Sequence, residues 1–415
     1  MLMPMRFYFI CITIVVSLWF AGGAVASETL HHWVQLGPDS QIVVRAISRS
    51  SECPILKVDG QFVVMRRRAS ADDEFPGHVC EQRLHQPVNN VSLDGTALPT
   101  LNQTIRRIAV IGDTGCRIRG RQVQACNDPE AWPLKAILAE IDAKKPDLVI
   151  HVGDYVYRGS PCPPGADCAG SPYGDNYQTW VADWLGPAQK LFSRAPFVFV
   201  RGNHENCGRG AKGWFRYFAA GPVPDECPAV TDPWKVLADG LDLIVFDASD
   251  GRAPESSRAR LSDYKRLADA TFTNLRHETW FLTHRPLWVN MFAFGELING
   301  DDTQREAFGA AIPEAFSLVL SGHIHAFQAL DLAAGPVQVI SGNGGTRLDP
   351  MPTGEKRDFE VAGSLMRQIV NDSGFGFLML TRMNDSAWQM DALDAKGILK
   401  RRCMVAGRRM SCSAQ

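Results

Sequence analysis

The segment Leu148-Val149-Ile150-His151-Val152-Gly153-Asp154-Tyr155-Val156-Tyr157 is the one around which this chain is organised. Its apolar half has strand character and ends at a glycine, after which Asp154 and Tyr157 follow three residues apart. A carboxylate has two oxygens, so one aspartate can bridge two metal ions that lie roughly 3.5–4 Å apart. Asp154 is the candidate bridge, and we expect the remaining ligands at the ends of neighbouring strands.

Length and composition indicate a globular protein of about two domains. The chain has 415 residues, which exceeds the size of most single hydrophobic cores. It is 45% hydrophobic and 21% charged, values typical of a globular protein. The formal net charge of −2 at pH 7 gives no reason to expect nucleic acid or an anionic membrane as a partner.

Residues 1–26 have the pattern of a secretory signal peptide. Arg6 supplies a short positive region, Phe7 to Phe20 form an apolar run, and Ala24-Val25-Ala26 place small residues before Ser27. An uncleaved anchor is the alternative, but the apolar run is short for a membrane span. The mature protein is therefore predicted to be periplasmic or secreted, with no stable membrane anchor after signal cleavage.

The cysteines agree with export. One of the eleven, Cys11, leaves with the signal, and an even number remains. An even number in an exported chain predicts disulfides, and the absence of any CxxC pair disfavours a structural zinc site. Sequence alone cannot fix the connectivity, but the cysteines fall into local couples that we expect to pair: Cys53/Cys80, Cys116/Cys126, Cys162/Cys168, Cys207/Cys227 and Cys403/Cys412.

The mature chain has two parts with different sequence patterns. Residues 27–104 are predicted to form a small all-β, sandwich-like domain, with strands at 33–36, 41–47 and 61–65 and a polar linker at its end. In residues 105–415, apolar runs alternate with helical patterns, which implies sheets buried on both faces. The predicted strands of this second domain are 108–111, 148–152, 197–200, 241–246, 280–282, 318–320 and 337–340, and the predicted helices are 130–144, 177–194 and 258–277.

Metal-ligating side chains follow five of these strands, where ligands collect in such folds. The motifs are Gly112-Asp113-Thr114-Gly115, Gly153-Asp154-Tyr155-Val156-Tyr157, Gly202-Asn203-His204-Glu205, Thr283-His284-Arg285-Pro286 and Gly322-His323-Ile324-His325. Any one motif has an ordinary explanation, since a histidine after a strand is often a core residue and Gly-Asp is often a turn or cap. Their joint occurrence, with four of the ten histidines, indicates a metal centre.

From residue 105 to about 395, these motifs and their order resemble the calcineurin-like metallophosphoesterase superfamily. The Gly153-Asp154-x-x-Tyr157 spacing makes the purple acid phosphatases the most similar branch. The resemblance implies a four-layer α/β/β/α sandwich of two mixed β-sheets in the catalytic domain. The β-rich segment before it is similar in texture to the larger purple acid phosphatases.

By this resemblance, Asp113, Tyr157 and His325 bind the first metal and Asp154 bridges to the second. The second metal takes the neutral donors Asn203, His284 and His323. Carboxylates and a phenolate are hard donors suited to Fe(III), whereas amide and imidazole groups suit a divalent ion such as Zn, Mn or Fe(II). The expected cofactors are therefore Fe(III) plus a divalent ion.

The expected activity is hydrolysis of a small phosphorylated substrate, a phosphate monoester, by metal-activated hydroxide. His204 is the candidate donor of a proton to the leaving group, and Glu205 either orients it or starts a helix. Arg201 and Arg285 lie near the metals in sequence, with Arg201 expected to pair with a core carboxylate. Two alternatives remain: a phosphodiesterase acting on cyclic nucleotides or glycerophospho-compounds, and a catalytically silent metal-binding surface protein.

Two departures from the family pattern and two loops bear on substrate recognition. The stretch 288–294 lacks the histidines that plant-type purple acid phosphatases carry there, and Ala326-Phe327-Gln328 stands where those enzymes often have Tyr-Glu-Arg. Residues 341–345 resemble the family's glycine-rich loop near the metals. The segment 159–176 is either a disulfide-pinned loop at the mouth of the site or a surface insertion.

Overall fold

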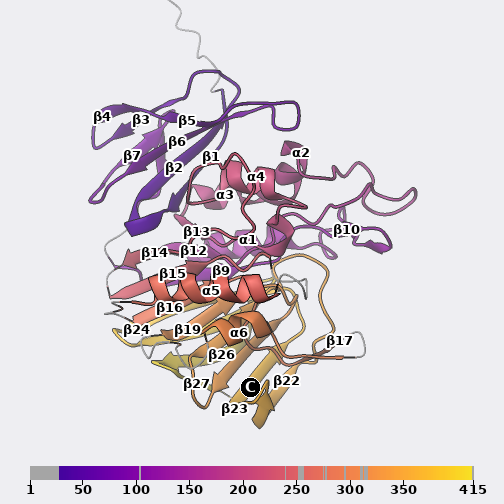
Figure 1. Ribbon diagram of the computed structural model, residues 1–415. Coiled ribbons are helices and arrows are strands. Elements are labelled where there is room, and N and C mark those ends of the chain that lie inside the picture. Colours follow the sequence, from indigo (N-terminus) through magenta and orange to yellow (C-terminus); the bar gives the residue numbers. More distant parts are fainter. Residues whose placement is uncertain are drawn as a thin grey trace, which may run out of the picture.

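Two large β-sheets bring the metal motifs together (Figure 1). The computed structural model describes residues 28–101, 104–238, 240–250, 257–273, 275, 278–293, 296–308, 312 and 316–413. The predicted signal peptide, 1–26, lies outside these residues. In the part of the chain that is described, no helix is long and apolar enough to cross a membrane.

The first sheet has eleven strands, with parallel neighbours β9, β12 and β13 at its centre. Its strands in spatial order are β27 (Arg409–Cys412), β26 (Leu399–Ala406), β25 (Ala387–Asp394), β24 (Gly376–Asn384), β9 (Arg107–Ile111), β12 (Leu148–His151), β13 (Phe197–Phe199), β1 (Thr29–Leu36), β2 (Ile42–Ser48), β6 (His78–Leu84) and β5 (Arg66–Ala69). The strands from β24 to β27 pair antiparallel, as β24 does with β9.

The second sheet has eight strands and is also mixed. In spatial order they are β14 (Trp234–Ala238), β15 (Leu241–Phe246), β16 (Glu278–Thr283), β19 (Phe316–Ser321), β21 (Val337–Ser341), β20 (Phe327–Leu332), β23 (Ser364–Asp372) and β22 (Gly354–Val361). The run from β15 through β16 and β19 to β21 is parallel, so these strands end at one edge.

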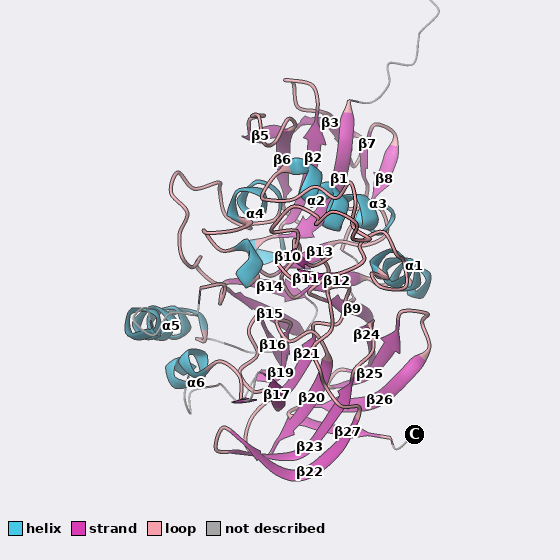
Figure 2. Ribbon diagram, turned by 90° about the vertical axis from the view of Figure 1, so that its right-hand side faces the viewer, coloured by secondary structure: helices cyan, strands magenta, loops and turns pink. Residues whose placement is uncertain are grey.

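The two sheets face each other across an apolar core, to which both contribute, for example Ile150 and Val198 from the first sheet and Leu282 and Leu320 from the second. A second cluster packs helices onto the outer face of the first sheet: α1 (Leu134–Lys144), α2 (Tyr177–Trp180), α3 (Gly186–Phe192) and α4 (Ala211–Tyr217). A third cluster packs α5 (Ser257–Thr271) and α6 (Asp302–Phe308) against the second sheet (Figure 2). The predicted fold class, a mixed α/β protein with a β-rich N-terminal segment, is confirmed.

The N-terminal segment has its own core but shares a sheet with the rest. A four-stranded sheet packs over β1, β2 and β6 through a buried cluster that includes Val44 and Leu56; its strands are β4 (Gln61–Val64), β3 (Ile55–Val58), β7 (Val91–Leu93) and β8 (Thr96–Leu98). Strand β1 also pairs with β13, at Gln35 and Phe197, so the N-terminal strands extend the first sheet. The boundary placed near residue 104 stays a prediction.

The predicted elements are present with shifted ends, but many other elements were not predicted. The predicted helix 130–144 begins only after Pro133, and the predicted helix 177–194 is α2 and α3 joined by a π-helical segment, Val181–Leu185. Helix α5 ends at Thr271, earlier than predicted. The strands that were not predicted include β3, β6, β14, β20 and those from β22 to β27, and the helices α4 and α6 were not predicted either. Two small hairpins are also additional, formed by β10 (Ile118–Arg119) with β11 (Gln122–Val123) and by β17 (Met291–Ala293) with β18 (Glu296–Ile298). A 3₁₀ turn, Pro38–Ser40, separates β1 from β2.

The structure forms disulfides within all five local cysteine couples, and four of them contain a buried cysteine, so only Cys207–Cys227 joins two exposed cysteines. Cys80 and Cys168 are completely buried, whereas their partners Cys53 and Cys162 are only partly buried. Cys80 belongs to the core of the N-terminal strands, and Cys168 to the cluster beneath the outer helices. These two disulfides therefore tie a surface segment to a hydrophobic core. The five bonds are Cys53–Cys80, Cys116–Cys126, Cys162–Cys168, Cys207–Cys227 and Cys403–Cys412.

A buried ionic cluster joins the N-terminal strands to the segment after the third metal motif. Glu81 on β6 accepts hydrogen bonds from Arg45, Arg68 and Arg83. The three guanidinium groups also donate to carbonyl groups of residues 215–221, at the end of α4. The last carbonyls of a helix lack partners within the helix and carry partial negative charge, so cations suit them. One carboxylate thus balances three cations that cap this helix end.

We expect Glu81→Gln to lower the free energy of unfolding at pH 7 by about 3–5 kcal/mol, because it leaves buried guanidinium groups without their counter-charge. Burial raises the pKa of Glu81, but the three arginines outweigh burial and leave its pKa below the ordinary 4.5. The contribution of the ionised carboxylate is therefore complete above about pH 4.5 and is lost as the pH falls through the folded-state pKa. Urea unfolding at several pH values tests this. The exposed Glu52→Gln is the control, and equal effects in the two variants contradict the prediction.

Candidate metal centre

The predicted ligands lie at the facing edges of the two sheets, each directly after a strand. Asp113 follows β9, Asp154 follows β12, and His323 follows β19. These three have φ of 55°, 61° and 70°, in the left-handed region that side chains other than glycine rarely adopt. Such backbone strain is typical of functional sites, where the surrounding structure holds it.

The first group of donors surrounds the hydroxyl of Tyr157. This oxygen lies 2.7 Å from Asp113 Oδ1, 2.7 Å from Asp154 Oδ2 and 3.1 Å from His325 Nε2. His325 Nε2 is in turn 3.5 Å from Asp113 Oδ1. All four side chains are buried. Two carboxylates, a phenol and an imidazole therefore converge on one point, as the prediction for the first metal requires.

The second group shares Asp154 with the first. Asp154 Oδ1 lies 3.3 Å from His284 Nε2, which is 3.2 Å from Asn203 Oδ1. Ligand atoms of Asp154, His284 and His323 all lie within 4.8 Å of one another. The two oxygens of Asp154 thus face different groups, Oδ2 toward Tyr157 and Oδ1 toward His284, which is the geometry of a bridging carboxylate.

Backbone carbonyl groups orient two of the histidines. His284 Nδ1 lies 2.8 Å from the carbonyl oxygen of Val152, and His325 Nδ1 lies 2.9 Å from that of Arg347. Since a carbonyl only accepts, each Nδ1 carries the proton and donates it, which leaves the Nε2 lone pair directed at the centre. A ligating histidine characteristically has its other ring nitrogen held in this way.

The charges of the site fit bound cations. Burial and the neighbouring Asp154 raise the pKa of Asp113 well above its usual range, and burial with Asp113 and Asp154 does the same to Tyr157. Burial also acts to raise the pKa of Asp154, but His284 and His204 together hold it well below its usual range. Bound metal ions would supply the positive charge that stabilises the ionised forms of Asp113, Asp154 and Tyr157 in this buried place.

Comparison with known proteins agrees with this geometry. The family model for calcineurin-like phosphoesterases matches residues 106–327. The chain belongs to the calcineurin-like phosphoesterase family. A solved structure of purple acid phosphatase PPD1 from yellow lupin (Lupinus luteus) seeds is similar with a TM-score of 0.60 and 14% identity, covering 92% of this chain and 74% of that one. A structure of PhoD has a TM-score of 0.55 and 11% identity, covering 94% and 93%. No curated protein sequence matches.

Membership in this family makes the protein a metal-dependent phosphoesterase. The buried Glu205 supports the backbone of the candidate bridging residue, Asp154. The Glu205 carboxylate accepts hydrogen bonds from the backbone N–H groups of Asp154 (3.0 Å), Tyr155 (2.8 Å) and Gly202 (3.1 Å). Its bond from the Gly202 N–H caps the start of the 3₁₀ turn Asn203–Glu205. Of the two roles considered for it, the helix-start role is the correct one: Glu205 holds the backbone of two metal motifs and does not orient His204.

Glycines make room for the ligands in this phosphoesterase. A Cβ on Gly202 would lie 2.2 Å from both the backbone nitrogen and Oδ1 of Asp154. A Cβ on Gly342 would lie 2.1 Å from the carbonyl oxygen of Ile324 and 2.8 Å from Asp113 Oδ2. The glycine-rich loop 341–345 therefore packs directly beside the metal ligands. Real Cβ contacts do not occur at such distances, so both positions require glycine.

His204 lies beside the centre with its ring held in place. Its ring centroid is 3.9 Å from that of Tyr157, and its backbone N–H donates to Asp154 Oδ1 at 2.7 Å. His204 Nδ1 lies 3.0 Å from the carbonyl oxygen of Val156, so Nδ1 is the donor and Nε2 is left for other contacts. Burial is the main cause that lowers the pKa of His204, to about 3.

The two arginines of the motifs have different environments. Arg201 is buried, and its guanidinium pairs with Asp247 at 3.1 Å and donates to the backbone of Glu205 at 3.0 Å. The expected core carboxylate partner of Arg201 is thus present. Arg285 instead borders the metal-site cavity, where Nη1 lies 3.3 Å from His323 Nε2 while Nε donates to the carbonyl of Ala248.

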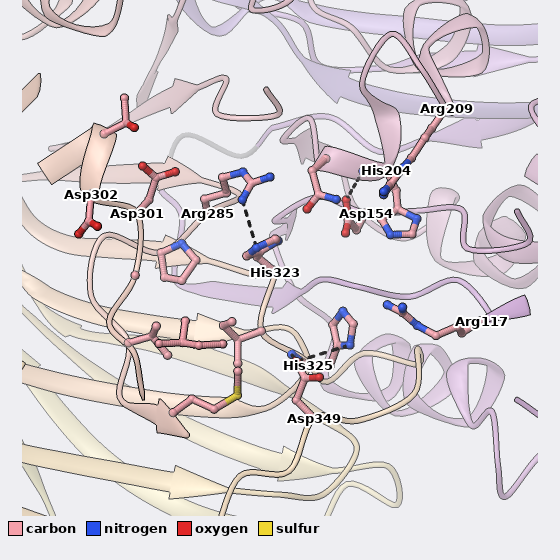
Figure 3. A pocket seen from close by; sticks show the side chains of 18 of the residues that line it. Arg117, Asp154, His204, Arg209, Arg285, Asp301, Asp302, His323, His325 and Asp349 are labelled. Carbon is pink, nitrogen blue, oxygen red and sulfur yellow. Dashed lines mark hydrogen bonds and ion pairs between the residues drawn. The ribbon is translucent and has the colours of Figure 1, made fainter. Parts of the chain in front are cut away.

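A cavity of about 710 Å³ opens over the metal-binding residues (Figure 3). Sequence analysis missed several of its lining residues, among them Arg117, Arg209 and Asp349. Asp349 accepts a hydrogen bond from the backbone of His325 at 3.0 Å. Arg117 directly follows Cys116, and Arg209 stands two residues after Cys207, so a cysteine beside a metal motif was the only available signal.

The segment 159–176 does not border this cavity. None of its described residues lines the cavity, and its buried Cys168 is directed into the core beneath the outer helices. A second cavity, however, is lined by Gly159, Gly174 and Asp175 of this segment together with Tyr157, His204 and Arg209. The segment therefore lies beside the candidate centre, and both alternatives for it stay predictions. The sequence could not distinguish them, because a cysteine couple looks the same whether it faces a site or a core.

We expect Asp154→Ala to lose both metal ions, because the two carboxylate oxygens serve both groups of ligands. Asn203→Ala should deplete chiefly the divalent ion, since Asn203 belongs to the second group alone. Metal content per chain, measured by elemental mass spectrometry after extensive dialysis, tests both. The control is Asp302→Asn, at the far end of the same cavity, which should keep both ions. Two tightly bound ions in Asp154→Ala would refute the bridging assignment.

Tyr157→Phe is expected to abolish a visible absorption band of the iron-loaded, oxidised protein. A trivalent ion bound to the phenol oxygen displaces its proton, and ferric phenolates absorb visible light by charge transfer. The matched control is Tyr155→Phe, because Tyr155 lies on the same loop but donates its hydroxyl to the carbonyl of Val200. A band that survives Tyr157→Phe unchanged shows that Tyr157 is not a ligand.

Proposed function

We propose that this phosphoesterase is an exported phosphatase that hydrolyses phosphate monoesters, in the manner of the purple acid phosphatases it resembles. The observation that carries the proposal is the hydroxyl of Tyr157, placed between two carboxylates and His325. The similar fold of the lupin purple acid phosphatase supports it. The signal-like N-terminus and the five disulfides support export.

Each residue of the centre has a part in holding the metals. Asp113, Tyr157 and His325 would hold Fe(III), and Asn203, His284 and His323 a divalent ion, with Asp154 between them. The hard, anionic donors belong to the first group and the neutral ones to the second, which is the distribution that favours this pairing. The ions would supply charge that stabilises the phosphate and a lowered pKa for the attacking water.

The protein groups around the metals provide the rest of the chemistry. A water oxygen forms a new bond to phosphorus, the ester P–O bond breaks, and its electron pair goes to the leaving oxygen. That oxygen takes a proton from Nε2 of His204 in its imidazolium form, in which Nδ1–H still donates to the carbonyl of Val156. Because burial lowers the pKa of His204 to about 3, this acid form is populated at low pH. Arg285, aimed into the cavity beside His323, is placed to bind a non-bridging phosphate oxygen.

Phosphodiester hydrolysis is the second candidate, because the cavity is larger than one phosphate requires. Its wall includes Val289 and Met291, from the stretch that lacks the histidines of plant-type enzymes, and also Ile298, and these side chains offer an apolar surface to a second ester arm. Activity on 4-nitrophenyl phosphate and bis(4-nitrophenyl) phosphate, with metals assayed in the same preparation, separates the two. A higher kcat/KM for the diester overturns the monoesterase proposal, and no activity in a fully metal-loaded preparation supports a silent binding protein.

His204→Ala should lower kcat for propyl phosphate by about 10²–10⁴-fold, the usual contribution of a general acid. The fall should be much smaller for 4-nitrophenyl phosphate, because nitrophenolate leaves without needing a proton. Metal content is measured in parallel, and His85→Ala, an exposed histidine of the N-terminal segment, is the control. Equal falls on the two esters would show that His204 acts on structure or metal binding instead.

A further inference from the structure

The metal-site cavity has charges of opposite sign at its two ends. Arg117 and Arg209 border it beside His204, whereas Asp301 and Asp302 border it beyond Arg285 (Figure 3). His204 marks the side of the leaving group in the proposed function. The cationic end therefore lies where the leaving group of a substrate would sit.

Arg117 is held rigidly with its charge directed at the cavity. It directly precedes the β10–β11 hairpin, which the Cys116–Cys126 disulfide closes and which bonds to the loop after Tyr157 through Ile118 N–H and the carbonyl of Tyr157 at 3.2 Å. The guanidinium carbon lies 4.8 Å from the centroid of the Tyr157 ring. The side-chain contacts of Arg117 within the described chain are neutral: this ring and Gln122 Oε1, at 3.0 Å from Nη1. Its Nε is buried and has no hydrogen-bond partner.

Arg209 approaches the same place from a second disulfide-pinned loop. Its neighbour Gly210 donates a backbone hydrogen bond to the carbonyl of His204 at 2.9 Å, and the Cys207–Cys227 disulfide closes the loop. The positive charges of Arg209 and Arg117 both act on His204. Two arginines from separate, cross-linked loops thus flank the proton donor.

We propose that Arg117 and Arg209 form a second anion subsite, and that the preferred substrates carry another phosphoryl group on their leaving group. The inference rests on the proposed function, because the role of His204 sets which end receives the leaving group. Guanidinium groups bind phosphate in bidentate fashion, and the side-chain contacts of Arg117 within the described chain are to neutral groups, which leave its charge for a bound anion. The guanidinium carbon of Arg117 lies 4.8 Å from the centroid of the Tyr157 ring, whose hydroxyl belongs to the first group of donors. Because this distance is short, the two phosphoryl groups of the substrate are joined by a short link.

The chemistry of the step is unchanged by this subsite. A water oxygen bonds to the phosphorus held beside Asp154 and Arg285, the P–O bond to the leaving group breaks, and the leaving oxygen takes a proton from Nε2 of the imidazolium form of His204. The released product keeps its second phosphoryl group on the arginines. Bisphosphates of short diols and phosphoanhydrides both meet the requirement, and they differ in whether the leaving oxygen is an alkoxide or a phosphate oxygen.

The test compares two substrates that differ in one phosphoryl group, ethane-1,2-diol bisphosphate and 2-hydroxyethyl phosphate, with inorganic pyrophosphate as the phosphoanhydride. Arg117→Gln and Arg209→Gln should each lower kcat/KM for the bisphosphate about tenfold more than for the monophosphate, the size expected for a hydrogen bond to a charged group. The control is Arg121→Gln, an exposed arginine of the same hairpin that does not line the cavity. A similar loss for pyrophosphate assigns the subsite to phosphoanhydrides as well.

A binding measurement keeps the test independent of turnover. Calorimetric titration of the metal-loaded protein with methylenediphosphonate and with methylphosphonate should show that only the former binds about tenfold more weakly to the arginine variants, again the size of a hydrogen bond to a charged group. Equal effects on both ligands, or none, overturn the subsite, whatever the enzyme hydrolyses. Selective loss of binding in a protein that prefers diesters would leave the subsite standing while the monoesterase proposal fails.

Discussion

The hydroxyl of Tyr157 lies 2.7 Å from a carboxylate oxygen of Asp113 and 2.7 Å from one of Asp154, and all three side chains are buried. Acidic groups so close together repel one another when ionised and are costly to bury unless cations accompany them. The rest of the architecture serves this one arrangement. Two sheets end beside it, backbone carbonyls fix the histidines around it, and Glu205 ties the loops that carry Asp154 and Asn203.

The ligands come from different strands, so their spacing depends on how the sheets meet. Strands β9, β12 and β13 are parallel neighbours in the first sheet, and β16 and β19 are parallel neighbours in the second. A buried apolar core holds the sheets face to face. Because interiors are closely packed, a shift of one sheet against the other would be resisted by the whole core. The metal centre is in this way positioned by hydrophobic packing that contains no ligand at all.

An element or contact of this protein could be predicted where neighbouring residues in the sequence determine it. The ligands were predictable because each follows a short apolar strand, and the strands β9, β12, β15, β19 and β21 were predictable because they are largely apolar. Strand β25 was not predicted, although its buried residues largely alternate with partly buried ones, a pattern that is itself typical of a strand. Nothing local indicates that Glu81 collects three arginines from three strands, or that Arg117 and Arg209 meet at His204, because disulfides and sheet pairing create those contacts. The role of Glu205 was ambiguous for the same reason: its partners are backbone groups of a loop far away in the sequence.

The pairing of β1 with β13 has a consequence for the order in which the chain acquires structure. Strand β1 is synthesised early, but its parallel neighbour β13 comes much later in the chain and leads into the third metal motif. The carbonyl groups at the end of α4, which accept hydrogen bonds from the arginine cluster, follow later still. The N-terminal strands therefore stay incomplete until the middle of the chain has emerged. Long-range pairing of this kind slows folding and leaves sheet edges open in the meantime. Under the export proposed above, a chain that crosses the membrane unfolded would lose nothing by such a delay, because its last contacts would form after it had crossed.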